Sequence, residues 1–309
     1  MTSEIWIALL IFNKFLVYLG IAAAIGGSAS MLLFTRFDVI ASRASTVRLW
    51  QKQVCKYALI LMGLGFTANV ADFFVQTGNL SEDGLKGMFE PIMLEMMWVS
   101  SVGTLTLVRA LSLALAMLMV LYALLLRTSL NTVPKLIGFG LATLLIISAL
   151  SYSFTLSGHT NSLELGSVTL ISLHVAMAFA WLGALIPLIY ACYHFNNSEL
   201  YLLMHRFGSY AVWGVSILLL AGIAMLIQLL PSLDALLFSN YGQLFMLKVG
   251  FVLVLLLFAM LHKFVLVPRL LQQANGHTKL RHSIMAEAFI GLLVLITTSV
   301  VTTAVGPPI

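Results

Sequence analysis

Eight apolar stretches recur along the 309-residue chain, and no other feature constrains its fold as strongly. Each has roughly the 20 residues that a helix needs to cross the hydrocarbon core of a membrane. Only 9% of the residues are charged and 61% are hydrophobic, whereas about 25% of a typical soluble domain is charged. Lipid is therefore the solvent for most of this surface. We predict an all-α, polytopic membrane bundle that forms a single domain over residues 1–309, with spans at 5–34, 54–75, 104–126, 136–156, 167–192, 210–230, 244–266 and 284–305.

The segment between the second and third spans does not fit a crossing helix. Residues 76–90 are polar, acidic and Gly-rich, and the apolar piece from Pro91 to Gly103 is too short for a separate crossing. We expect a short interfacial or re-entrant helix there. The alternative is one long, tilted third helix from Ile92 to Leu126.

Basic residues are distributed unevenly between the two ends of the spans. Because basic loops stay in the cytoplasm, we expect both termini on the extracytoplasmic side of a bacterial inner membrane. The first apolar stretch lacks a basic segment before it, so we interpret it as an uncleaved span rather than a signal peptide. Twelve of the 16 basic residues lie in or beside four loops on one side: Arg36, Arg43, Arg48, Lys52, Lys56, Arg127, Lys135, Arg206, Lys263, Arg269, Lys279 and Arg281.

Charged residues at membrane depth are costly and usually have a function. Asp72 and Lys248, together with Lys14 and Arg109, fall in the outer third of the predicted bundle. They can form a structural network of ion pairs and hydrogen bonds, or they can belong to a pathway. Glu287 is expected one turn inside the eighth helix, where it either pairs with Arg281 or Lys263 or serves as a lower gate. We predict Glu287, Asp72 and Lys248 as pathway or gating residues.

Two histidines lie on consecutive helices at similar depth. His159 and His174 are joined by the short outer loop Thr160 to Gly166, so that their imidazoles can converge on one ion. Imidazole suits copper, zinc and haem iron. Met177, one turn below His174, adds a soft thioether. We predict His159, His174 and Met177 as metal ligands.

Methionines also gather in the apolar piece after the second span. Met93, Met96 and Met97 share one helical face by their i, i+3, i+4 spacing. Neutral thioethers bind a soft cation such as Cu(I), although Met more generally fills gaps in packing. We predict the three as an outer metal-capture cluster, on a helix that begins at Pro91.

Several enzyme signatures are missing from the sequence. There is no Gly-x-Ser-x-Gly elbow, no phosphate-binding loop of the Walker type and no His-Glu-x-x-His motif. We therefore expect a protein that is not an enzyme, in which transport runs on a gradient or is driven by a partner.

Several short motifs follow one another along the second half of the chain. They are Ser157–Thr160, Leu173–Met177, Trp181–Pro187, Arg206–Tyr210, Tyr241–Leu244 with Lys248, Pro268–Leu270, Arg281–Ser283 with Glu287 and Gly291, and Pro307-Pro308. Their order resembles that of the copper resistance protein D (CopD/PcoD) family. The resemblance spans nearly the whole chain, with a CopD-like core over about 136–309. One departure is His262-Lys263, where the family often has an Asn-Arg-like pair, and no role is carried onto His262.

The resemblance implies an inner-membrane protein that moves copper ions from the periplasm toward the cytoplasm. It also implies a periplasmic copper-binding partner (CopC-like), which we expect to be a separate chain. One alternative is a cupric reductase in which His159 and His174 are the axial ligands of a b-type haem, since bis-His ligation from neighbouring helices is chemically sensible. A plainer alternative is a membrane scaffold that only docks a copper chaperone.

Overall fold

The computed structural model describes residues 3–34, 44–81, 83–125, 133–156, 165–229 and 233–305, and within these ranges it is built from helices without a strand. Eight helices in this part of the chain are long and apolar enough to cross a membrane, as predicted. They are α1 (Ser3–Phe34), α2 (Ala44–Ser81), α5 (Ser101–Leu125), α6 (Val133–Tyr152), α7 (Leu165–His194), α8 (Asn197–Leu229), α10 (Asn240–Leu261) and α12 (Gly276–Ala304).

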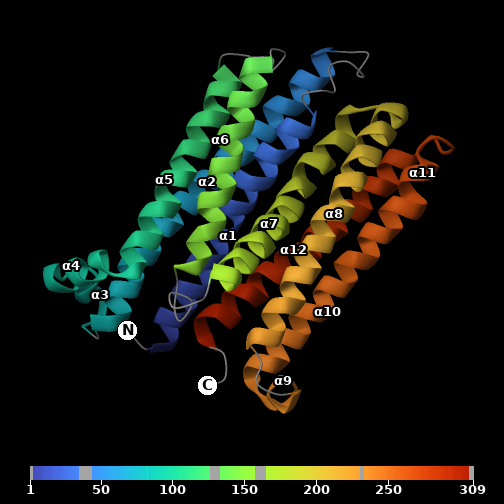
Figure 1. The fold of residues 1–309 in the computed structure, drawn as a ribbon. Coiled ribbons are helices and arrows are strands. Elements are labelled where there is room, and N and C mark those ends of the chain that lie inside the picture. The colour runs from blue at the N-terminus through green and yellow to red at the C-terminus, as the bar shows by residue number, and fades with distance from the viewer. Residues whose placement is uncertain are drawn as a thin grey trace.

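Short elements connect or extend these helices. α6 continues into the 3-10 helix η2 (Ser153–Thr155), and α10 continues through the π-helical turn η4 (His262–Leu266) into α11 (Val267–Arg269). Three further short helices, α3 (Gly84–Gly87), α4 (Pro91–Val99) and α9 (Leu233–Phe238), lie at the end of the bundle where the chain begins and ends (Figure 1).

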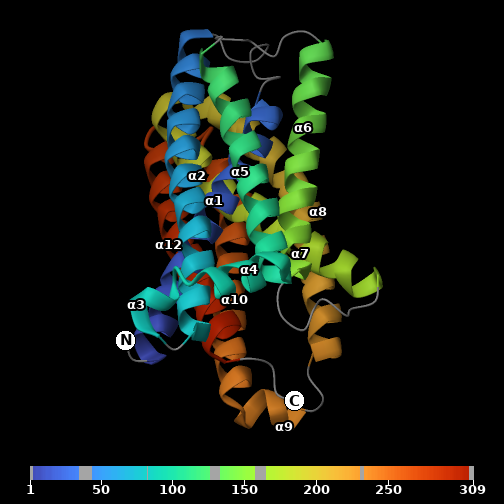
Figure 2. The ribbon, with the colours of Figure 1, turned by 90° about the vertical axis from the view of Figure 1, so that its left-hand side faces the viewer.

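The short helix α4 confirms the first of the two expectations for the segment before the third span. Pro91 occupies its first turn, where the missing N–H breaks no helical hydrogen bond. Ser100 then adopts an extended backbone conformation, with φ −81° and ψ 177°, and its hydroxyl accepts a hydrogen bond from Val102 N at 3.1 Å. This cap separates α4 from α5, so one continuous third helix is not formed. Figure 2 shows α3 and α4 beside the lower end of the bundle.

Two groups of helices meet at α7. α1, α2, α5 and α6 form one group, and α8, α10 and α12 the other, with α7 between them (Figure 1). In the apolar 18-residue part of each helix, 56% of the residues of α7 are buried, compared with 11% of those of α8 and 6% of those of α10. α7 is therefore the core of the bundle, and most of the surface of α8 and α10 faces outward.

Glycines allow α1 to approach α7 and α2 at backbone distance. A Cβ on Gly183 of α7 would overlap the carbonyl oxygen of Ala22 in α1, and a Cβ on Gly26 would overlap the backbone of Gly183. Where α1 meets α2, a Cβ on Gly20 would lie 2.7 Å from the Gly65 Cα. Small residues bring membrane helices together in this way because lipid supplies no hydrophobic drive for them to associate.

Three helices begin well before the predicted spans. α2 starts at Ala44, α8 at Asn197 and α12 at Gly276, where the sequence predicted starts at 54, 210 and 284. At the start of α8, Glu199 N donates to Asn196 Oδ1 at 2.9 Å and Asn196 N donates to Glu199 Oε2 at 3.2 Å. This reciprocal capping box fixes a polar first turn that apolar length alone does not reveal.

Candidate functional site

One face of α7 carries three of the polar and sulfur-containing side chains that the sequence singled out. His174, Met177 and Trp181 follow each other at i, i+3 and i+7, which places them on one side of the helix. His174 and Met177 meet α8, and Trp181 reaches α12. This row, called here the α7 face, runs inward from the end of the bundle that holds the termini.

His174 is held in one orientation and one tautomer. Its Nδ1 lies 3.0 Å from the carbonyl oxygen of Leu218 in α8. A carbonyl oxygen only accepts, so Nδ1 carries the proton and donates it. Nε2 then keeps its lone pair, and no hydrogen bond to it is formed by the described residues. An imidazole whose one nitrogen donates to a carbonyl while the other is free has the usual arrangement of a metal-binding histidine.

The helix opposite has room for these side chains because it carries glycines. A Cβ on Gly222 would lie 3.0 Å from His174 Cε1, and a Cβ on Gly214 would lie 3.5 Å from Met177 Sδ. Gly214, Leu218 and Gly222 share one face of α8 by their spacing of four residues. The predicted ligands His174 and Met177 therefore meet the same strip of α8.

Lys248 lies near this strip, on the outer half of α10. Its side chain is half-buried, and it is close enough to His174 for their charges to interact. The pathway or gating role predicted for Lys248 stays a prediction.

Glu287 lies deeper than predicted and has different partners. Because α12 begins at Gly276, Glu287 is about three turns inside the helix rather than one. Its Oε1 accepts a hydrogen bond from Trp181 Nε1 at 3.0 Å, and its Oε2 lies 3.3 Å from His262 Nδ1. The expected pairing with Arg281 or Lys263 is wrong: Arg281 stacks on the ring of Tyr193 at 4.4 Å, and Lys263 is exposed.

His262 is a buried partner of Glu287 to which the sequence assigns no role. It begins the π-helical turn η4, is 7% exposed, and its Nε2 lies 2.8 Å from Ser283 Oγ. The sequence gives only a partial signal for it. A carboxylate inside an apolar helix needs a proton or a partner, and His262 ends an apolar run in the preceding span, but the sequence does not show that the two meet.

The outer charged residues are held by hydrogen bonds, without ion pairs among the described residues. Lys14 Nζ donates to Thr302 O at 3.0 Å, and Arg109 Nε donates to Ser153 Oγ at 3.0 Å. Asp72 Oδ2 accepts from Gln76 Nε2 at 2.6 Å, while the buried Oδ1 has no hydrogen-bond partner within the same ranges. Lys14 and Arg109 are near enough to Asp72 to interact electrostatically. The structural network expected here is confirmed for the hydrogen bonds, and a pathway role for Asp72 stays a prediction.

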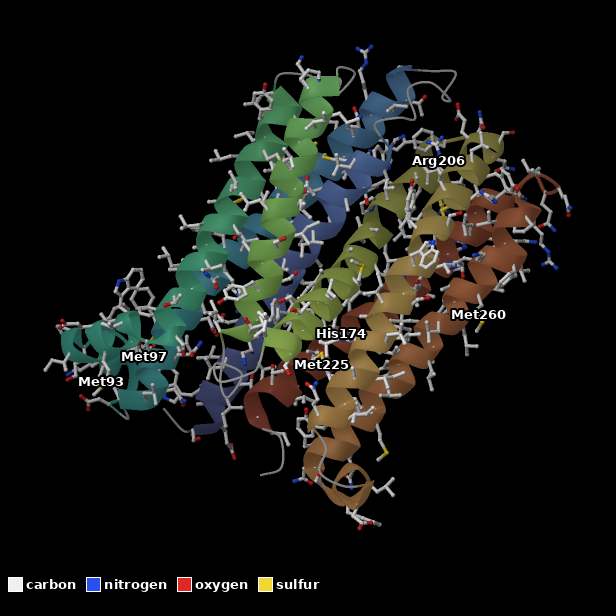
Figure 3. The ribbon with its side chains drawn as sticks, viewed as in Figure 1. Met93, Met97, His174, Arg206, Met225 and Met260 are labelled. Carbon is white, nitrogen blue, oxygen red and sulfur yellow. The ribbon has the colours of Figure 1, made fainter. Side chains whose placement is uncertain are left out.

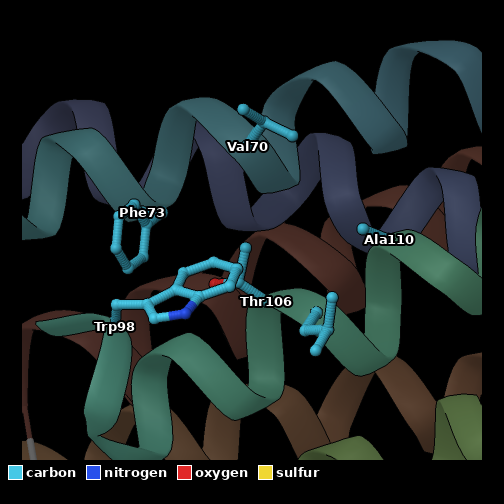
Figure 4. Close-up of a pocket in the computed structure, with 6 residues that line it drawn as sticks. Val70, Phe73, Trp98, Thr106 and Ala110 are labelled. Carbon is cyan, nitrogen blue, oxygen red and sulfur yellow. The ribbon is translucent and has the colours of Figure 1, made fainter. Parts of the chain in front are cut away.

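The three outer methionines differ in their surroundings. Met97 is 4% exposed, Met96 is 54% exposed, and Met93 is half-buried. Figure 3 shows Met93 and Met97 on α4 at the edge of the bundle, well apart from His174. Beside them, Val70, Phe73, Trp98, Thr106, Leu107 and Ala110 line a pocket of about 170 Å³ (Figure 4), whose wall is almost wholly apolar. That pocket offers no ligand for a metal ion.

The remaining predicted ligand, His159, lies outside the described residues. The expected approach of its imidazole to that of His174 therefore stays a prediction, as does the haem alternative, which needs both rings. Among the ranges that the structure describes, no cluster of three or more His, Cys, Asp or Glu side chains could hold a metal ion. A soft ion on the α7 face would instead be bound by one imidazole and neutral thioethers.

Comparison with known proteins gives two family matches and one curated relative. A model of the N-terminal domain of copper resistance protein D-like proteins matches residues 1–169, and a model of copper resistance protein D matches residues 201–301. The copper transport protein CutJ of Bacillus subtilis (strain 168) is 27% identical over 177 residues, which are 55% of this chain. The alignment covers 32% of that relative, so the chain spans about a third of its length. No solved structure matches the chain.

Proposed function

The chain belongs to the copper resistance protein D family, and from that premise we propose that it moves copper ions through the membrane, from the extracytoplasmic side toward the cytoplasm. Its eight long apolar helices support a multi-pass membrane protein. The name of the curated relative, a copper transport protein, supports the same cargo. The inner membrane of a bacterium is the location that fits the distribution of basic residues.

The observation that carries the proposal is the tautomer of His174. Its Nδ1–H donates to the Leu218 carbonyl, so Nε2 keeps a lone pair. A free imidazole nitrogen and the thioether of Met177 one turn away are ligands that suit copper, and both are neutral. Copper bound there gains contacts to replace its hydration from two ligands that carry no charge themselves.

The path that we propose follows the α7 face inward. Copper enters at the outer end, where His159 completes the site with His174 and Met177, and then passes Trp181 on its way to the cytoplasmic end. Met93, Met96 and Met97 deliver copper from the edge of the bundle. Glu287, Asp72 and Lys248 shape the electric field along the route without binding the ion themselves. A periplasmic copper-binding protein, as a separate chain, supplies the cargo.

A binding titration tests this function on the purified 309-residue chain. Cu(I) is titrated against a competing chelator, and X-ray absorption reports the ligands of the bound ion. His174→Ala should weaken the affinity at least ten-fold, which is about 1.4 kcal/mol, and should remove a nitrogen scatterer. His205→Ala is the matched control, because His205 is exposed on the cytoplasmic half of α8.

Two results would contradict the proposal. Equal affinity and equal spectra for the wild type and His174→Ala would remove His174 from the site. A strong visible absorption band of haem in the purified protein would favour the cytochrome, with His159 and His174 as axial ligands.

A further inference from the structure

A buried carboxylate and imidazole join three elements at the inner end of the α7 face. Glu287 of α12 is 2% exposed and His262 of η4 is 7% exposed. Trp181 of α7 donates to one carboxylate oxygen, and His262 lies against the other at 3.3 Å. Ser283 of α12 contacts the second imidazole nitrogen at 2.8 Å. Trp181, Glu287, His262 and Ser283 form a linear series of polar contacts, called here the acid–imidazole network.

The network is neutral only when it holds one proton. Without that proton, a buried carboxylate faces a neutral imidazole and the site carries a full negative charge, which is costly away from water. With one proton, the pair is either a carboxylate with an imidazolium or a carboxylic acid with a neutral imidazole, and the net charge is zero. A second proton would leave a buried positive charge. The form with one proton is therefore the only one without a net buried charge.

The charged groups on the elements packed around the network have other partners or lie elsewhere. On α12 itself, Arg281 stacks on Tyr193 of α7, and His282 is exposed. On η4, Lys263 is exposed. Lys14 of α1 bonds Thr302 O at the far end of α12, and His277 and Lys279 at the start of α12 contact Asn197 and Gln273. On α8, Glu199 accepts from Asn196 N, and His205 and Arg206 are exposed, as is Arg269 of α11. Lys248 of α10 lies four turns before His262, and His194 and Cys192 of α7 lie three turns beyond Trp181.

The turn that carries His262 is itself unusual. Residues 262–266 form a π-helical turn between α10 and α11, and such wide turns occur mostly at functional sites. His262 Nδ1 and Glu287 Oε2 approach to an ion-pair distance of 3.3 Å. This close acid–base pair therefore coincides with the irregular turn.

We propose that the acid–imidazole network is a proton-binding site that exchanges its proton for copper. The inference rests on the proposed function, because it takes the α7 face as the copper route. Met177 lies one turn before Trp181, whose N–H bonds Glu287. A Cu(I) ion on this face supplies the positive charge that the carboxylate otherwise takes from the proton, and charge interactions are strong in a dry interior. Each Cu(I) that binds releases one proton to water, so the charge of the site is unchanged.

The exchange is measured as proton release on copper binding. Cu(I) is added to the detergent-solubilised, 309-residue wild-type chain in weakly buffered solution with a pH indicator. We expect about one proton per Cu(I) bound, and a dissociation constant for Cu(I) that falls by about ten-fold for each unit rise in pH. Binding to neutral His174 and Met177 releases no proton, so the signal reports the network.

Glu287→Gln isolates the contribution of the pair. The amide oxygen can accept from Trp181 and the amide nitrogen can donate to His262, so shape and hydrogen bonds are kept while the exchangeable proton is lost. This variant should still bind Cu(I), with no proton release and no pH dependence of affinity. Asp234→Asn, which removes an exposed carboxylate in α9, should behave as the wild type.

The outcomes separate this inference from the proposed function. A wild type that binds Cu(I) without releasing a proton overturns the exchange and leaves the copper function standing. Unchanged proton release in Glu287→Gln also overturns it. A wild type that binds no Cu(I) overturns the proposed function instead. If Glu287→Gln fails to fold, the proton count and the pH dependence of the wild type alone decide the question.

Discussion

At the scale of single residues, the chemistry of the site depends on hydrogen bonds to the backbone of other helices, which the residue types in the sequence do not predict. The sequence identified His174 as a candidate ligand from its residue type and depth. Its tautomer, however, follows from the Leu218 carbonyl on another helix, 3.0 Å from Nδ1. Glu287 was likewise recognised as unusual, but its partner His262 became visible only once α10 and α12 were packed together.

The space that Gly222 leaves beside the His174 ring gives a prediction about a single residue. In Gly222→Ala the new Cβ would lie 3.0 Å from His174 Cε1 and 3.2 Å from Nδ1, so the ring must leave its present position. We expect the affinity for Cu(I) to fall by about ten-fold, or about 1.4 kcal/mol. Gly208→Ala on the same helix meets nothing within 4 Å and should have no effect. A chelator-competition titration of the two variants measures the difference, and equal affinities would show that the position of the ring is unimportant.

At the scale of helices, the sequence predicted every span and the short helix before the third one. Apolar length suffices for this, because only a helix satisfies its backbone groups inside lipid. The helix ends were predicted less well, since ends that project into water depend on capping residues such as Asn196 and Glu199. The pairing of helices could not be predicted from one sequence, because apolar periodicity does not say which faces meet.

The crossing of α1 and α7 supplies a prediction for this scale. Gly183→Ala places a methyl group against the Ala22 carbonyl, so the two helices must separate. Overpacking of this kind costs about 1–3 kcal/mol, and the melting temperature of the purified protein in detergent should fall. Gly63→Ala in α2, where nothing lies within 4 Å, is the control. A melting temperature equal to that of the control would mean that α1 and α7 do not cross at this point.

The methionines of α4 supply a second prediction about an element. Replacing Met93, Met96 and Met97 together by Leu keeps volume and apolarity but removes the sulfur atoms. If α4 captures copper, cellular copper uptake should fall in the triple variant at an unchanged protein level. Met88→Leu controls for sulfur loss at a neighbouring half-buried position that packs against the cluster of Trp6, Leu10 and Val75. Uptake equal to that of the wild type would assign the three methionines to packing alone.

At the scale of the whole molecule, the bundle has two chemically different ends. Ser3 and Val305, the first and last described residues, lie at the same end of the bundle as α4 and α9 (Figure 1). Arg206 lies toward the opposite end of the bundle (Figure 3). The α7 face and the acid–imidazole network lie between the two ends. The eight candidate spans among the described residues would place both termini on one side of the membrane. From the basic loops we predict that this is the extracytoplasmic side.

The orientation is checked with reporters fused at Ile309. A periplasmic reporter such as alkaline phosphatase should be active there, and a reporter that works only in the cytoplasm should be silent. Fusions within the loop before α8 should give the opposite pattern. A cytoplasmic signal from the Ile309 fusion would reverse the bundle, and with it the direction assigned to the copper route.

Copper flux through the reconstituted chain tests the central claim most directly. Proteoliposomes that contain the wild type, His174→Ala or His205→Ala enclose a fluorescent Cu(I) sensor, and Cu(I) is added outside. The account predicts that internal copper rises with time for the wild type and for His205→Ala, while His174→Ala stays at the level of protein-free vesicles. Equal flux through the wild type and His174→Ala, or no flux through the wild type, would contradict it.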